Sequence, residues 1–303
     1  MIETLFGLHP LAGATLVLYA AAAAVGAAAL VMGGVAVFAD PALWRKWRPA
    51  AWTALALLAA AFLANTAVIG GRWLEAGRPP FKTRFETLLL YPWCVTAVTF
   101  VLVALHRLHV LVPAAAAAAV ACLGVALAHP DLETVNLMPA LQSGWFVPHV
   151  VTYFVAYGAL FASCALAAMA LAAPLWESRL PAGGTTAKAP AGGTGMDFLT
   201  AKALAAHAHQ SAVFGTVVLT FGLVMGAVWA KFAWGDYWTW DPKENWSLIT
   251  WLAYMAYLHL ARMPGWGGRR SAWLLVASFG AVLFTWLGMH LLPTADNSLH
   301  VYQ

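Results

Sequence analysis

Residues 234–246 read WGDYWTWDPKENW, a tryptophan-rich, non-helical stretch between two long apolar runs. Six of the sixteen Trp residues of the chain lie between Trp229 and Trp251. The apolar runs on either side predict membrane helices, so this stretch is expected to form a loop at the membrane surface. Flat indole rings at that depth indicate a binding surface for a flat, apolar, partly charged ligand.

The composition of the whole chain predicts a polytopic membrane protein of the all-α class. Of its 303 residues, 62% are hydrophobic and 9% are charged, whereas a soluble domain carries roughly 25% charged residues. The first apolar run lacks a basic leader and is too long for a cleaved signal peptide. The net charge of +4 reads as a topology signal, so the expected partner is the lipid bilayer and no nucleic acid.

Eight spans are expected, each helical because lipid leaves no other way to satisfy the backbone of a non-barrel chain. They cover residues 11–38, 50–70, 86–106, 109–128, 148–176, 206–231, 246–262 and 270–291. Together they predict a single integral membrane domain over residues 1–303. Within it, 232–246 is the Trp-rich loop, and 177–200, rich in Gly, Ala, Pro and Thr, is a flexible cytoplasmic loop.

Basic residues predict the orientation, because cytoplasmic loops carry an excess of Lys and Arg. Ten fall on one side and six on the other, which predicts that the Trp-rich loop and both termini are extracytoplasmic. The inner (plasma) membrane is the expected location. The six on the outer side are Arg72, Arg78, Lys82, Arg84, Lys231 and Lys243. Four of them cluster in 72–84, where they could bind carboxylates of a ligand or form a solvated loop.

Counting spans places two histidines on the same face of the membrane as the Trp-rich loop. Two spans separate His149 from Trp234 and four separate His149 from His300, and an even number of crossings returns the chain to one side. Neutral imidazole is a common axial ligand of heme iron. His149 and His300 are therefore candidate heme ligands, although each taken alone could be an ordinary interfacial histidine.

His259 lies thirteen residues past Trp246, about 20 Å along the seventh span at 1.5 Å per residue. An ionisable side chain at that depth is a functional candidate, and a histidine near the inner surface is the alternative. The three cysteines, Cys94, Cys122 and Cys164, each stand alone in an apolar run, without CxxC or CxxCH. They are expected to be packing residues.

Residues Asp241 to Glu244 form a strong helix start, with an acidic N-cap, Pro242 at the first helical position and a capping box. Helix capping therefore explains Asp241 without a ligand. It does not explain Trp234, Trp238 and Trp240, which exceed the one or two rings of an ordinary interfacial belt. Gly235 would let the backbone approach a ligand or turn sharply.

Residues 234–244 resemble the WGxxWxWDPKE signature of the WWD heme-handling proteins of cytochrome c maturation. The resemblance extends over roughly residues 80–303 and is closest to the CcsA (also called ResC) branch of system II. The other stretches that carry it are RFETL at 84–88, LQSGWFVPHV at 141–150, ITWLAYMAYLHLAR at 249–262 and LHVY at 299–302.

This resemblance implies that His149 and His300 ligate heme beside the loop formed by Trp234, Gly235, Trp238, Trp240 and Asp241. It implies that His259 ligates heme b in transit across the membrane. The partners it implies are a CcsB (ResB)-like membrane protein and an apocytochrome c with a CxxCH motif. Any synthase activity would require CcsB. His290 stands where Asn is expected in many members.

Two other functions compete with that of a cytochrome c synthase subunit. One is a heme transporter without synthase activity, which sequence alone does not separate from a synthase that must also deliver heme. The other is a cytochrome b-like subunit that transfers electrons. A cytochrome b would hold heme between paired histidines deep in facing helices, and here only His259 is expected to be deep, which disfavours that function.

Overall fold

The computed structural model describes residues 11–28, 44–128, 142–177, 200–288 and 291, and all regular structure in these ranges is helical. The all-α prediction is thereby confirmed. His300, His290, both termini and nearly all of the predicted 177–200 loop lie outside the described residues.

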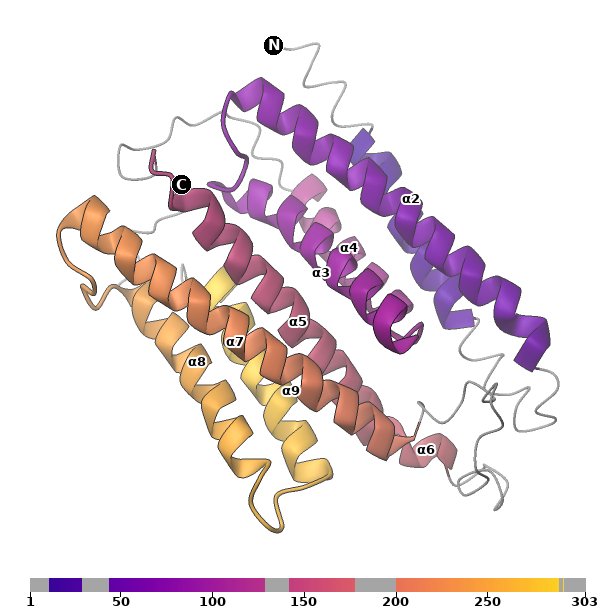
Figure 1. The fold of residues 1–303 in the computed structure, drawn as a ribbon. Helices are drawn as coiled ribbons and strands as arrows, with labels where there is room; N and C mark the ends of the chain where they lie inside the picture. Colours follow the sequence, from indigo (N-terminus) through magenta and orange to yellow (C-terminus); the bar gives the residue numbers. More distant parts are fainter. Residues whose placement is uncertain (1–10, 29–43, 129–141, 178–199, 289–290, 292–303) are drawn as a thin grey trace.

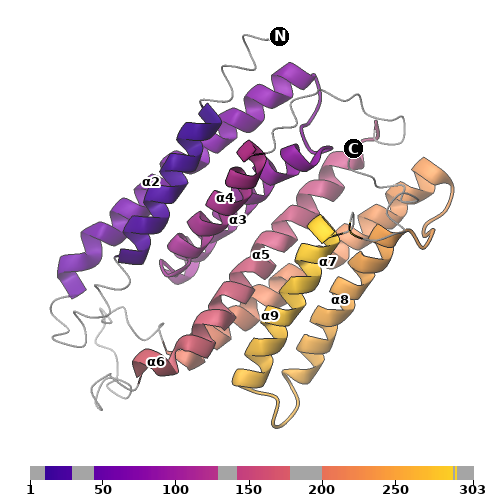
Figure 2. The same cartoon turned by 180° about the vertical axis from the view of Figure 1, so that it is seen from behind.

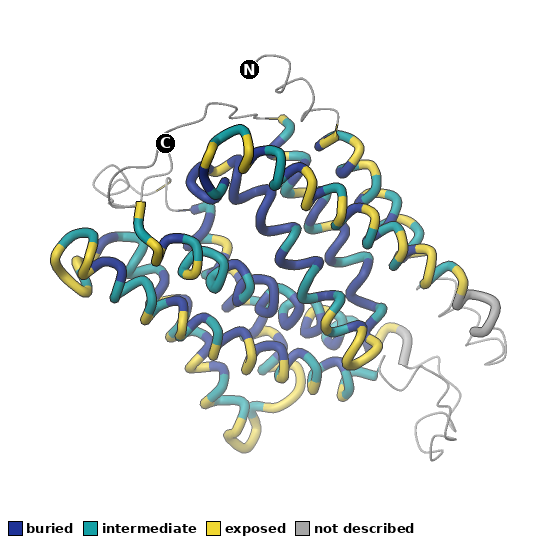
Figure 3. The backbone as a smooth tube through the Cα atoms, turned by 45° about the horizontal axis from the view of Figure 1, so that its top comes forward, coloured by how far each residue is buried: buried dark blue, intermediate teal, exposed yellow. Residues whose placement is uncertain are grey.

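The long helices pack side by side as an antiparallel bundle (Figures 1 and 2). An N-terminal helix spans Leu11–Ala28. The following helices are α2 (Trp44–Ala76), α3 (Arg84–His106), α4 (Leu111–Ala128), α5 (Phe146–Ala172), α6 (Pro174–Glu177), α7 (Ala201–Trp234), α8 (Pro242–Leu260) and α9 (Arg269–Leu283), which continues into the π-helical turn η4 (Phe284–Gly288). The buried positions run along the inner helices, above all α3 and α5 (Figure 3).

Within the described ranges, seven helices are long and apolar enough to cross a membrane. Seven of the eight predicted spans match these helices. The first of them is matched over residues 11–28, the part that the structure describes. The remaining prediction, 246–262, corresponds to α8, which is more polar. Its 19 residues reach about 28 Å at 1.5 Å per residue, and it lies against α7 and α9 (Figure 2). The chain is thus a multi-pass membrane protein.

The most extensive helix contact is the seam between α5 and α7, where three glycines of α7 face large side chains of α5. A Cβ at Gly215 would lie 2.6 Å from Leu160 Cδ2, and one at Gly222 would lie 2.8 Å from Tyr153 Cδ2. At such distances something must shift. Small residues let membrane helices approach closely and gain van der Waals packing. The seam therefore fixes α5 against α7 at these positions.

The connections between helices alternate between two ends of the bundle. We call the end that carries residues 77–83 and 235–241 the loop end, and the other the opposite end. The six basic residues predicted to share a side all lie at the loop end, in or next to the ends of α2, α3, α7 and α8. Those of the other ten that the structure describes lie at the opposite end. The partition of basic residues is confirmed, and its relation to the cytoplasm stays a prediction.

Candidate ligand-binding site at the loop end

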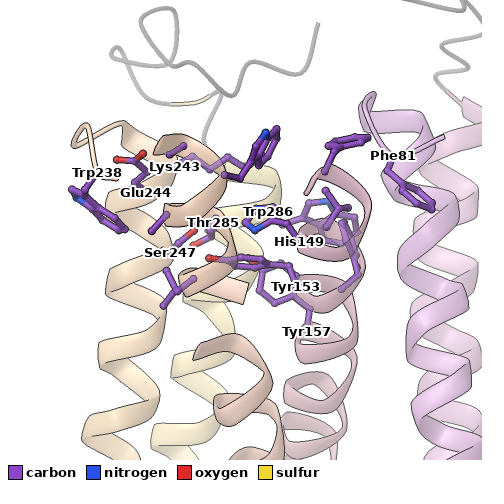
Figure 4. A pocket seen from close by; sticks show the side chains of 18 of the residues that line it. Phe81, His149, Tyr153, Tyr157, Trp238, Lys243, Glu244, Ser247, Thr285 and Trp286 are labelled. Atoms are coloured by element: carbon purple, nitrogen blue, oxygen red, sulfur yellow. The ribbon is translucent and has the colours of Figure 1, made fainter. Parts of the chain in front are cut away.

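A cavity of about 1080 Å³, including open space at its mouth, lies at the loop end of the bundle (Figure 4). Side chains of α5, α7, α8 and η4 line it, together with Phe81 and Lys82 from before α3 and Tyr237 and Trp238 from the loop. Elements far apart in sequence therefore meet around one space.

His149 lies in the wall of this cavity, in the first turn of α5 (Figure 4). Its Nδ1 lies 3.0 Å from the carbonyl oxygen of Gly222 on α7. A carbonyl only accepts, so Nδ1 carries the proton, and the ring lone pair is on Nε2. Histidines that ligate metals usually donate their other ring N–H to an acceptor of this kind, which fixes the orientation of the ring.

Packing also holds the His149 ring. Its centroid lies 4.9 Å from that of Tyr153 and 5.4 Å from that of Trp229. A Cβ at Gly226 would lie 2.6 Å from His149 Cε1, so this position of α7 has room for the ring only because it is glycine. The α5–α7 seam thus sets both the place and the tautomer of His149.

The structure separates the three loop tryptophans that the sequence grouped together. Trp238 lines the cavity, and its indole Nε1 is buried without a hydrogen-bond partner. Trp234 ends α7 and packs on Trp229, with ring centroids 5.8 Å apart. Trp240 does not line the cavity, is 69% exposed and has a left-handed backbone with φ +60°. Of the three predicted platform rings, only Trp238 faces the space.

Helix caps define the ends of the loop. Gly235 has φ +91°, and its N–H donates to the Lys231 carbonyl, which ends α7 in a left-handed cap. Asp241 is buried and accepts from Lys243 N at 2.8 Å, while Glu244 accepts from Asp241 N at 3.2 Å. The predicted capping box is confirmed, and the non-helical segment is 235–241, narrower than the expected 232–246.

Sequence reasoning missed most of the aromatic wall. Tyr153, Tyr157 and Trp286 line the cavity (Figure 4), and Trp286 is anchored by an Nε1–H bond of 3.3 Å to Thr87 Oγ1. The signal for the tyrosines was the spacing 149, 153, 157, which puts all three on one face of α5. Trp286 gave no local signal, because only tertiary packing, of α9 against α5 and of its own indole against Thr87 of α3, brings it to the cavity.

The site residue His259 lies away from this cavity. It is exposed in the last turn of α8, and the whole length of that helix separates it from Asp241. Other histidines gather at the same opposite end: His209 Nδ1 lies 3.0 Å from Tyr257 Oη, and the rings of His106 and His207 lie 5.2 Å apart. His149 and Trp238 share a site, and His259 does not belong to it.

The basic cluster before α3 is packed inside the protein. Arg72, Arg78 and Lys82 are at most 8% exposed, whereas Arg84 is exposed. The two terminal guanidinium nitrogens of Arg78 donate to the two carboxylate oxygens of Glu86, at 3.0 and 3.1 Å. For the three buried residues, the solvated-loop interpretation is therefore wrong.

No three His, Cys, Asp or Glu side chains converge to hold a bare metal ion in the part of the chain that the structure describes. All three cysteines are unpaired thiols. The groups that line the cavity include one oriented imidazole, a set of aromatic rings, two lysines (Lys82 and Lys243) and the carboxylate of Glu244, which accepts from the backbone N–H groups of Thr239 and Asp241. This set suits a large planar ligand with a coordinating centre and anionic groups.

Comparison with known proteins adds an independent finding. The model of a family described as Cytochrome C assembly protein matches residues 82–295, which include every cavity-lining residue except Phe81. The chain is 36% identical over 264 residues to "Cytochrome c biogenesis protein CcsA" of Synechococcus sp. (strain CC9311), covering 80% of this chain and 86% of that relative.

Two further relatives carry the same name. The protein of Parasynechococcus marenigrum (strain WH8102) is 34% identical over 257 residues, covering 80% of this chain and 84% of its own length. That of Microcystis aeruginosa (strain NIES-843 / IAM M-2473) is 32% identical over 303 residues, covering 84% and 91%.

Proposed function

Because this chain belongs to the cytochrome c assembly protein family, we propose that it is the heme-handling subunit of a cytochrome c synthase. It binds heme in the loop-end cavity and presents it to an apocytochrome c. The observation that carries this proposal is the orientation of His149. Its Nδ1–H donates to the Gly222 carbonyl, and its ring lines an aromatic cavity.

Heme is the substrate in this proposal, and the cavity residues divide the work of holding it. His149 Nε2 supplies one axial ligand to the iron. Tyr153, Trp229 and Trp286 give apolar contact to the porphyrin, and Trp238 closes the side toward the loop. The second axial ligand is His300, which lies outside the described residues and is proposed from the span count and the family motif.

The reaction proposed is addition of two cysteine thiols of a CxxCH motif to the two vinyl groups of heme. Each addition forms one S–C bond, and the thiol hydrogen ends on the neighbouring vinyl carbon, so no net oxidant or reductant is consumed. The protein then needs to supply orientation and exclusion of competing ligands rather than a catalytic side chain. The histidine of CxxCH displaces one protein ligand, and the heme leaves with the cytochrome.

We propose that the loop end faces outward in the plasma membrane, because more basic residues lie at the opposite end. Heme then has to cross the membrane before it reaches the cavity. His259 at the opposite end of α8 is the candidate ligand for heme in transit, together with a ligand from a CcsB (ResB)-like partner.

Replacing His149 tests the proposal directly. His149→Ala should lower the heme recovered with the purified protein by about tenfold or more, since losing even the hydrogen-bond partner of a metal ligand costs about 10–100-fold in metal affinity. His207→Ala, a histidine at the opposite end, is the control and should keep wild-type heme. Heme content is read by absorption spectroscopy, and added imidazole should restore part of it. A wild-type spectrum from His149→Ala would reject the site.

The loop tryptophans provide a matched pair. Trp238→Ala should weaken heme binding about tenfold, because it removes a ring that lines the cavity. Trp240→Ala should change binding less than about twofold, because that ring is 69% exposed. Heme titration of both purified variants, at equal membrane levels, compares them. Equal losses would show that the loop acts as one unit or only as a membrane anchor.

The transit role of His259 predicts an effect at a distance. In the complex purified with its CcsB-like partner, His259→Ala should lower heme in the loop-end cavity while leaving titration of added heme into that cavity unchanged. Supply is reduced, but the cavity itself is intact. Wild-type heme content and cytochrome c yield would show that His259 is only a surface residue of the last turn of α8.

A further inference from the structure

We propose that Lys82 binds a carboxylate of the ligand in the loop-end cavity and thereby fixes the orientation of the porphyrin ring. This inference rests on the proposed function, because it names the residue that would recognise the propionates of heme. It is carried by the place of Lys82: a cationic side chain, 8% exposed, in the wall of an otherwise largely apolar cavity.

The backbone of Lys82 is fixed by the start of α3. Its N–H donates to Glu86 Oε2 at 2.7 Å, and the N–H of Thr83 donates to the same oxygen at 3.1 Å. Thr83 closes the capping box by accepting from Glu86 N at 3.2 Å. Lys82 is therefore held at the cavity by a helix cap and not by a freely moving loop.

Charged side chains gather around Glu86, next to this wall of the cavity. Glu86 receives the two-pronged pair from Arg78, and Arg72 Nε lies 3.8 Å from Glu86 Oε1. Arg72 also pairs with Glu75 at 3.4 Å. Among the described residues, this cluster holds three cations (Arg72, Arg78, Lys82) and two carboxylates (Glu75, Glu86). The wall of the cavity at Lys82 therefore adjoins a cluster in which the described positive side chains outnumber the described carboxylates.

The pKa of the Lys82 ammonium also depends on the charges around it. Burial, followed by the nearby positive charge of Arg78, lowers the pKa of the Lys82 ammonium, and Glu86 raises it in part. A bound carboxylate stabilises the charged ammonium and would shift that pKa back up. Ligand binding and protonation of Lys82 therefore favour each other.

Lys82 and His149 approach the cavity from different elements, the segment before α3 and the first turn of α5. An axial bond alone leaves the porphyrin free to rotate about the iron–nitrogen axis. A carboxylate contact at Lys82 removes this freedom. Because the propionates project from one edge of heme and the vinyl groups from the rest of the ring, holding the propionates also presents the vinyls in one direction.

The experiment compares heme with heme dimethyl ester, in which both propionates are uncharged, on the purified full chain. Wild-type protein should bind heme about tenfold more tightly than the ester, as expected for one charge-assisted contact. Lys82→Met should lose this difference by binding heme more weakly and the ester as wild type does. Arg84→Met removes the same charge from an exposed neighbour outside the cavity wall and should keep the difference. Lys82→Arg should retain most of it.

Binding of the ester serves as the folding control, because it needs the cavity and His149 but not the carboxylates. If Lys82→Met still prefers heme as strongly as wild type does, or if Arg84→Met loses the preference equally, the role of Lys82 is overturned and the heme site stands. If wild-type protein binds neither heme nor its ester, the proposed function fails. If Lys82→Met fails to bind the ester, the test is made with Lys82→Arg instead. Should Lys82→Arg bind the ester as wild type does but no longer prefer heme over it, the proposal is overturned.

Discussion

The close approach of α5 and α7 is the constraint on which the site depends. Gly222 and Gly226 are two of the three glycines that let these helices touch, and both take part in seating His149. Gly226 leaves room for the imidazole, and the carbonyl of Gly222 accepts its Nδ1–H at 3.0 Å. A larger residue at either position would displace the ring or its neighbour Tyr153. The contact that packs α7 against α5 therefore also positions the imidazole of His149.

A second anchor lies across the cavity, at the start of α3. Glu86 gathers a bidentate arginine and two backbone N–H groups within 3.1 Å, and so holds a polar turn rigidly beside apolar helices. Buried carboxylates are stable only with such partners. The two anchors differ in kind: the α5–α7 seam holds an oriented imidazole, and the turn before α3 holds positive charge. A ligand with both a coordinating metal and carboxylates matches the two together.

Much of the fold could be predicted from the sequence because the positions of the helices depend mainly on local features of the chain. The length of the apolar runs located the helices, since a chain that crosses lipid without forming a barrel has to be helical. Asp241, Pro242 and Glu244 indicated the start of α8, because together they form a helix cap. Span parity placed His149 beside the Trp-rich loop, and the shared cavity confirms this. The ends of the helices were less predictable: α7 continues to Trp234 because the left-handed cap at Gly235, not the end of the apolar run, terminates it.

The site was only partly predictable, because its walls come from tertiary packing. Trp234, Trp238 and Trp240 look equivalent in sequence, yet the left-handed turn at Trp240 sends the three rings to different places. Trp229 and Trp286 enter the site only when α7 and α9 close around α5. The burial of Arg72 and Lys82 likewise depends on the ion-pair cluster around Glu86, which charge counting along the chain does not reveal.

The most direct test of the central claim is an experimental density map of the full chain purified with heme. We expect porphyrin density in the loop-end cavity, with iron bound to His149 Nε2 and the Nδ1 hydrogen bond to the Gly222 carbonyl intact. Heme located elsewhere, or heme bound in the cavity with His149 turned away from the iron, would contradict it.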